Sequence, residues 1–120
     1  MRILTDLIDK AEDTLDEVFY YAEKAHHLKI ENKALADTYI KIAEMHIDIY
    51  KMLHDKMVML ITEKRKVTEP PKEMLAIWDY EHEKLIKEFN EAKMLVEEYN
   101  KSYWKYEFFA WQLFDYFFDY

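Results

Sequence analysis

The sequence has no glycine in its 120 residues, and its only two prolines, Pro70 and Pro71, are adjacent. Glycine is the main supplier of left-handed turn and bulge conformations, so its absence disfavours tight hairpins and sheets. Alanine, leucine, glutamate, lysine and methionine, which favour helix, are plentiful. We therefore expect an all-α fold, and the length is that of one domain with a real core.

Apolar residues recur at spacings of three and four along three long stretches, which is the period of an amphipathic helix. Asn32 is a candidate N-cap for the second helix, and Pro71 suits the first position of the third. Because short connections make consecutive helices antiparallel neighbours, we predict an antiparallel three-helix bundle. The helices are expected over about residues 4–28, 34–67 and from Pro71 onward, with breaks near residues 30–33 and 68–71.

The same spacing predicts which residues form the core. In the first helix the expected stripe is Leu4, Ile8, Ala11, Leu15, Val18, Ala22 and Ala25. In the second it is Leu35, Tyr39, Ile42, His46, Ile49, Leu53, Met57 and Leu60. In the third it is Leu75, Trp78, His82, Leu85, Phe89, Ala92, Val96, Tyr99 and Tyr103.

The last eighteen residues hold eleven of the chain's twenty aromatic residues. We interpret residues 1–102 as the bundle and residues 103–120 as an aromatic C-terminal helical extension of the same domain. Whether this tail folds back as a fourth helix, forms a homo-oligomer or binds a partner is open. The residues predicted for partner binding or self-association share one helical face: Trp104, Phe108, Trp111, Phe114 and Phe118.

The formal net charge of −8 disfavours direct contact with nucleic acid or anionic membranes. It permits a basic protein partner, including a nucleic-acid enzyme with a basic groove. The absence of cysteine excludes disulfides and thiolate metal sites and indicates a cytoplasmic location. We expect no signal peptide, since the first residues have no continuous apolar run, and the charged tail is too short to span a bilayer.

No Ser/His/Asp pattern, phosphate-binding loop or cysteine cluster is present, so we predict a non-enzymatic protein without a cofactor. The alternative is a metal site on the helix stripes. Counting outward from the two connections places His46 level with Glu12 and Asp16, and His82 level with His54. Imidazole and carboxylate suit Fe, Zn or Mn, but a hydrogen-bonded core histidine explains each position as well.

Three segments together resemble small ferritin-like helical proteins encoded by phages and prophages of Firmicutes. They are residues 34–43 (ALADTYIKIA), residues 53–55 (LHD) and residues 69–84 (EPPKEMLAIWDYEHEK). The Pro-Pro-x-x-Met run with its later His-Glu-Lys is the most specific part, and the resemblance covers roughly residues 10–100. It implies a ferritin-like bundle of phage origin, located in the cytoplasm of the bacterial host.

The resemblance also bears on function. The second helix of such proteins often carries Glu-x-x-His, where this chain has His46-Ile-Asp-Ile49. Isoleucine cannot bind a metal, so the resemblance implies a degenerate His/carboxylate site. The expected function is a phage-type protein-interaction module, for example an inhibitor of a host defence protein. The alternative is a metal-binding ferritin-like protein that retains a transition metal.

Overall fold

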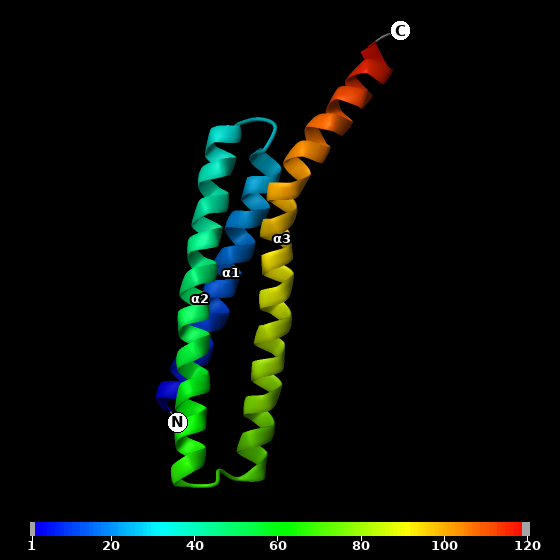
Figure 1. Ribbon diagram of the computed structural model, residues 1–120. Helices are drawn as coiled ribbons and strands as arrows, with labels where there is room; N and C mark the ends of the chain where they lie inside the picture. Colours follow the sequence, from blue (N-terminus) through cyan, green and yellow to red (C-terminus); the bar gives the residue numbers. More distant parts are fainter. Residues whose placement is uncertain (1, 119–120) are drawn as a thin grey trace.

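The computed structural model describes the backbone of residues 2–118 and the side chains of residues 2–101. The described part of the chain is all helical, with three helices and no strand. They are α1 (Arg2–Leu28), α2 (Lys33–Val67) and α3 (Lys72–Phe118). The predicted all-α three-helix bundle is confirmed for these residues, and consecutive helices run antiparallel (Figure 1).

Local signals set the helix limits where the sequence predicts them. The Asn32 side chain accepts a hydrogen bond from the Leu35 N–H at 3.1 Å, so the predicted N-cap of α2 is confirmed. Three basic residues occupy the last turn of α2, where cations stabilise the helix C-terminus. The third helix begins at Lys72, one residue later than predicted, because the Pro71 carbonyl accepts the first helical bond, from the Leu75 N–H at 3.1 Å.

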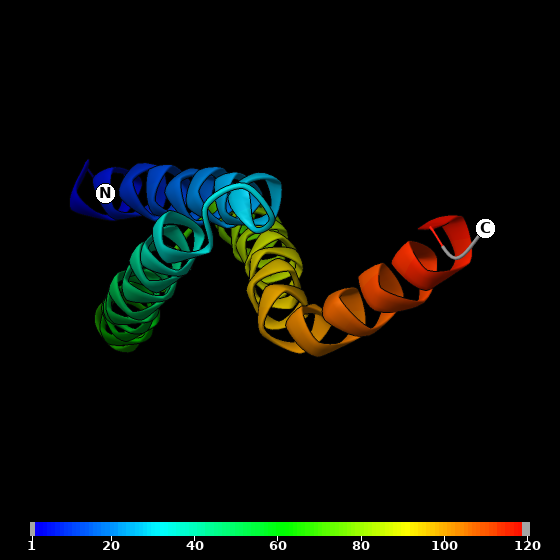
Figure 2. The same ribbon diagram turned by 90° about the horizontal axis from the view of Figure 1, so that it is seen from above.

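The three helices do not pack equally. Helix α1 packs along both α2 and α3, whereas α2 and α3 touch each other at only a few points. Viewed along the bundle, α2 and α3 diverge from the side of α1 that they share (Figure 2). The central position of α1 explains why its predicted stripe is correct: six of the seven positions are buried and Ile8 is half-buried.

The core stripe predicted for α2 is wrong in most positions. The buried residues lie one position further along the chain: Ala36, Ile40, Ala43, Ile47 and Tyr50, with Met57 as the one predicted member that is buried. Leu35 and Ile49 are exposed, and Tyr39, Ile42, His46, Leu53 and Leu60 are half-buried. The physical reason is the pair of fully buried alanines, Ala36 and Ala43, whose small side chains let α1 approach closely.

The core stripe predicted for α3 is largely confirmed. Trp78, Leu85, Ala92, Val96 and Tyr99 are buried. The predicted positions Leu75, His82 and Phe89 are half-buried, because they face the side where α2 and α3 diverge. The predicted Tyr103 side chain lies outside the described residues.

Helix α3 is much longer than its neighbours. Its 47 residues correspond to roughly 70 Å, against roughly 53 Å for the 35 residues of α2. The helix therefore continues beyond the α1–α2 connection (Figure 1). Its backbone is one continuous helix to Phe118, so it does not turn back as a separate fourth helix. The side chains of Trp104, Phe108, Trp111, Phe114 and Phe118 lie outside the described residues, so their predicted role stays a prediction.

Candidate functional site

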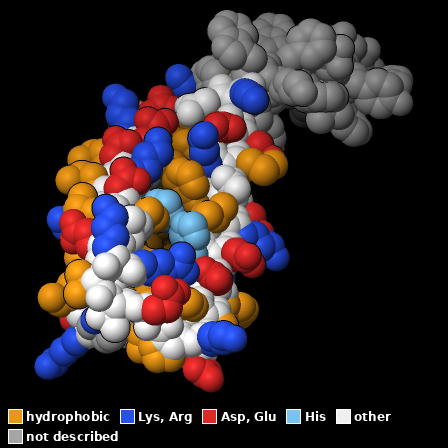
Figure 3. Space-filling view, turned by 60° about the horizontal axis from the view of Figure 1, so that its bottom comes forward, with side chains coloured by type: hydrophobic (Ala, Val, Ile, Leu, Met, Phe, Trp, Pro, Cys, Tyr) orange, Lys and Arg blue, Asp and Glu red, His pale blue; other side chains and the backbone are white. Residues whose placement is uncertain are grey.

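Two histidines meet where α2 and α3 come together. The Nε2 atoms of His54 and His82 lie 2.9 Å apart, so one ring donates its Nε2–H to the other. The rings are 17° from parallel, with centroids 5.0 Å apart. Both side chains are half-buried, and histidines reach the surface between flanking apolar and charged side chains (Figure 3). The predicted level of His82 with His54 is confirmed.

Aromatic packing holds the ring of His54 in place. His54 stacks on Tyr50 with centroids 5.9 Å apart, and Tyr50 stacks on Phe89 of α3 at 4.8 Å. The Tyr50 hydroxyl is buried without a hydrogen-bond partner among the described residues, and this burial raises the pKa of Tyr50 to about 12. The Asp55 carboxylate lies 3.6 Å from the Nδ1 atom of His54.

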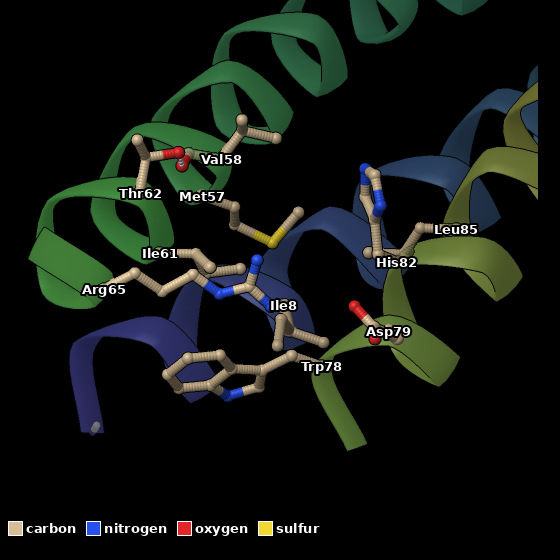
Figure 4. Close-up of a pocket in the computed structure, with 10 residues that line it drawn as sticks. All are labelled: Ile8, Met57, Val58, Ile61, Thr62, Arg65, Trp78, Asp79, His82 and Leu85. Carbon is tan, nitrogen blue, oxygen red and sulfur yellow. Dashed lines mark hydrogen bonds between the residues drawn. The ribbon is translucent and has the colours of Figure 1, made fainter. Parts of the chain in front are cut away.

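A pocket of about 180 Å³ lies next to the pair, between α2 and α3 with α1 as its floor. Most of its lining is apolar, and its ionisable residues are Arg65, Asp79 and His82. Figure 4 shows Asp79 and His82 on the same side of α3, and Arg65 reaching in from α2. The apolar lining is Ile8, Met57, Val58, Ile61, Trp78 and Leu85, with Thr62.

The other predicted constellation is brought together only in part. His46 and Asp16 line the same hollow between α1 and α2. The His46 ring stacks on Tyr21 at 5.6 Å, and its Nδ1 donates to the Ile42 carbonyl at 2.9 Å. His46 is therefore a half-buried residue whose polar atom has a local partner, instead of the fully buried core residue expected.

Glu12 lies on the other flank of α1, facing α3. Its carboxylate pairs with Lys84 at 3.7 Å, whereas His46 packs on the opposite flank. Burial raises the pKa of Glu12, the Lys84 ammonium opposes the shift, and a hydrogen bond with Glu81 adds to it. Counting residues from the connection gave the level of Glu12 along the bundle, but not the direction in which it points.

The described side chains contain no group of three or more His, Asp or Glu residues arranged to hold a metal ion. Of the five residues considered as ligands, the structure pairs His54 with His82 and places His46 near Asp16. Glu12 joins neither group. A Fe, Zn or Mn centre of the ferritin-like type has no assembled ligand set among these side chains.

An exposed apolar stripe on α2 is a surface that the sequence analysis did not predict. We define the outer stripe of α2 by its residues: Leu35, Ile42, Met45, Ile49, Met52 and Met59. Met52 is 73% exposed and Met45 is 62% exposed, while Ile42 is half-buried. Consecutive members are seven, three, four, three and seven residues apart, which fits the heptad pattern of a helix that packs against another helix. The signal available in the sequence was the seven-residue repeat of methionines at positions 45, 52 and 59.

An acidic wall runs beside the outer stripe. A hollow of about 470 Å³ lies between α1 and α2, where Asp13, Asp16 and Glu17 of α1 face His46 and Ile49 of α2. Lys10 and Thr14 complete the lining. We call Asp13, Asp16 and Glu17 the acidic wall. Ile49 of the outer stripe lines this hollow, so the acidic wall and the stripe meet there.

A buried lysine lies at the end of the bundle that contains the α1–α2 connection. Lys29 is 8% exposed, and its ammonium donates to the Tyr99 carbonyl at 2.9 Å and lies 4.5 Å from the centre of the Tyr99 ring. The Tyr99 hydroxyl donates to Asp37 at 2.6 Å. These contacts join the α1–α2 connection, which includes Lys29, to Asp37 of α2 and Tyr99 of α3. No sequence pattern predicts these contacts, because Lys29 lies next to a helix end, where lysines are common.

Comparisons with known proteins add no relative. No protein-family model, no curated protein and no solved structure matches this chain. In addition, none of the helices in the described part of the chain has both the length and the hydropathy of a membrane span.

Proposed function

We propose that this chain is a non-enzymatic protein-interaction module whose α1–α2 face binds an amphipathic helix of a partner protein. The observation that carries the proposal is the exposed outer stripe of α2. Folded proteins rarely expose a long apolar stripe without a binding role. Methionine side chains are flexible and polarisable, and they suit surfaces that adapt to a partner.

The length of the stripe fits a helical partner. From Ile42 to Met59 it covers roughly 26 Å of helix at 1.5 Å per residue, which is several turns. Recognition of a helix by a groove or stripe uses apolar anchors at this alternating spacing. Two positions of the repeat are polar: Thr38 lies between Leu35 and Ile42, and Lys56 lies between Met52 and Met59. Such a polar position helps to fix the register of a partner helix.

The charge beside the stripe indicates the chemistry of the partner. The acidic wall lines the α1 side of the stripe, and the whole chain carries a net charge of −8. A partner helix with lysine or arginine beside its apolar face would complement the wall. A second copy of this chain would bring two acidic walls together, so the charge favours a different, basic protein.

The test uses a synthetic three-heptad helix with leucine at the core positions and lysine at the flanking positions. Isothermal titration should detect binding to the protein, and binding should weaken when glutamate replaces the lysines. In the double variant Met45→Gln/Met52→Gln, the apolar contact is lost while the net charge is unchanged. We expect at least about tenfold weaker binding, which corresponds to about 1.4 kcal/mol.

The matched control is Met94→Gln on α3, where the side chain is 57% exposed and lies away from this face. This variant should bind the peptide like the original protein. Equal binding by the double variant and the control would show that the peptide is attracted by net charge alone, and would refute the proposal.

We also propose that the natural partner is a protein of a bacterial host, and that binding inhibits it. The resemblance to phage-encoded helical proteins and the acidic surface support this extension. Proteins captured by the original chain but not by Met45→Gln/Met52→Gln identify the partner. Its activity should then fall on addition of the original chain, and an unchanged activity would reject inhibition while leaving the binding surface intact.

A further inference from the structure

The histidine pair is placed in an unusual way for a structural contact. His54 and His82 come from the two helices that otherwise touch least, and their Nε2 atoms point at each other at 2.9 Å. A hydrogen bond of this kind needs one protonated and one unprotonated nitrogen. The unprotonated Nε2 of a neutral imidazole is also a good ligand for a transition metal.

We propose that His54 and His82 together bind one divalent transition-metal ion, of the Ni²⁺, Cu²⁺ or Zn²⁺ class, which bridges α2 and α3. With metal–nitrogen bonds of about 2.0–2.1 Å, two nitrogens 2.9 Å apart subtend about 90° at the metal. This angle matches adjacent positions of a square-planar or octahedral ion, so Ni²⁺ and Cu²⁺ fit best. Each ring has to turn so that both lone pairs point to the ion.

The surroundings of His54 support metal binding independently of the separation of the two Nε2 atoms. The Asp55 carboxylate lies 3.6 Å from Nδ1, on the side of the ring opposite the Nε2 atom. This separation is longer than a hydrogen bond, but rotation of the exposed Asp55 side chain would let its carboxylate accept one from the Nδ1–H group, which is the contact that metal-bound histidines usually make. The Tyr50 ring, itself packed on Phe89, limits how far the imidazole can move.

The surroundings of His82 provide access. His82 lines the 180 Å³ pocket, which also contains one carboxylate, Asp79, and one guanidinium, Arg65. The two opposite charges leave the pocket without strong repulsion of a cation. Since the described side chains offer no third ligand already in place, water would complete the coordination. The inference does not depend on the proposed function, because the pair lies on the α2–α3 side and the acidic wall on the α1–α2 side.

Titration of the chelator-treated protein without a polyhistidine tag tests the site. Isothermal titration with NiCl₂ should show one ion bound per chain, and bound Ni²⁺ should raise the melting temperature. His54→Gln and His82→Gln keep a polar side chain of similar size and remove one ligand each. Each should weaken binding by at least the roughly 10- to 100-fold that loss of an outer-shell partner costs.

His27→Gln is the matched control, because His27 is exposed at the end of α1 and far along the chain from the pair. It should bind Ni²⁺ like the original protein. Melting curves of all variants without metal establish that each is folded. Absence of saturable Ni²⁺ binding, or binding that survives in both His54→Gln and His82→Gln, would overturn the proposal and leave the pair as a hydrogen bond only.

Discussion

The two sides of α2 are built from similar residues, but one side is buried and the other is exposed. The inner side contains Ile40 and Ile47 with Ala36 and Ala43, and all four are buried. The outer stripe contains isoleucine and methionine at the same helical spacing, and most of it is exposed. What differs is the alanines, which let α1 pack closely against the inner side. Hydrophobicity alone therefore does not decide which side of a long helix enters a core.

Because α1 packs only on the inner side of α2, the outer stripe remains exposed and can contact a partner. A three-helix bundle covers one side of α2, and here α1 does so almost alone, because α3 contacts α2 at few points. The apolar residues beyond that contact have no neighbour among the described side chains that buries them. If the outer stripe binds a partner, substitutions in it should weaken binding and hardly change the free energy of unfolding. Substitutions on the inner side should lower the free energy of unfolding.

The largest expected effect comes from truncating matched isoleucines on the two sides. Ile40 is 4% exposed and Ile49 is 44% exposed, so the same substitution removes different amounts of buried surface. Ile40→Ala should lower the free energy of unfolding by about 2–5 kcal/mol, the cost of a cavity in a core. Ile49→Ala should cost below about 1 kcal/mol. Urea denaturation measures both.

Equal losses of unfolding free energy in these two variants would mean that the outer stripe is buried in the folded protein under the conditions of the experiment. Dependence of the Ile49→Ala result on protein concentration would identify self-association as the reason. Either result would remove the contrast between the two sides of α2.

A smaller effect is expected where the inner side of α2 makes a polar contact with α3. The hydrogen bond from the Tyr99 hydroxyl holds the pKa of Asp37 below its ordinary value of 3.8, and Lys33 lowers it further. Because the folded-state pKa is the lower one, this bond stabilises the fold above the unfolded-state pKa, and the gain is lost as pH falls through the folded-state pKa. Tyr99→Phe should cost about 1 kcal/mol at pH 7, since Asp37 is partly exposed.

The measurement is the free energy of unfolding of Tyr99→Phe and the original protein from pH 7 to pH 2. The difference should shrink once the pH falls below about 3.8, where Asp37 is protonated in the unfolded chain. Tyr80→Phe is the control, since Tyr80 is 65% exposed, and it should change little at any pH. A difference that stays constant down to pH 2 would show that the contribution of the Tyr99 hydroxyl does not depend on the ionisation of Asp37.

The sequence was sufficient for those parts of the fold that depend on neighbouring residues. Asn32 caps α2 and Pro70-Pro71 separates α2 from α3, as predicted, because capping and proline geometry act within a few residues. The level of His82 with His54 was also predictable. The α2–α3 connection is short, so residues equally far from it lie opposite each other along the bundle.

The sequence was insufficient where rotation about the helix axis matters. Glu12 was predicted to lie level with His46 as a candidate co-ligand, but its side chain pairs with Lys84 of α3, because its position on α1 faces α3. The core of α2 was predicted one residue away from its true position for the same reason. An apolar period identifies a helix, but when two apolar stripes coexist only packing against α1 selects the inner one.

The most direct test of whether the outer stripe binds a partner helix is an NMR titration of the methionine methyl groups with the synthetic three-heptad leucine–lysine helix. The chain has seven methionines, which report on separate places. Met45, Met52 and Met59 lie on the outer stripe, Met57 is 3% exposed in the core and Met94 is exposed on α3. We predict that the signals of the three outer-stripe methionines shift and saturate together, while those of Met57 and Met94 change little. Unchanged outer-stripe signals, or equal shifts at Met94, would contradict the proposal that this face of α2 binds a partner helix.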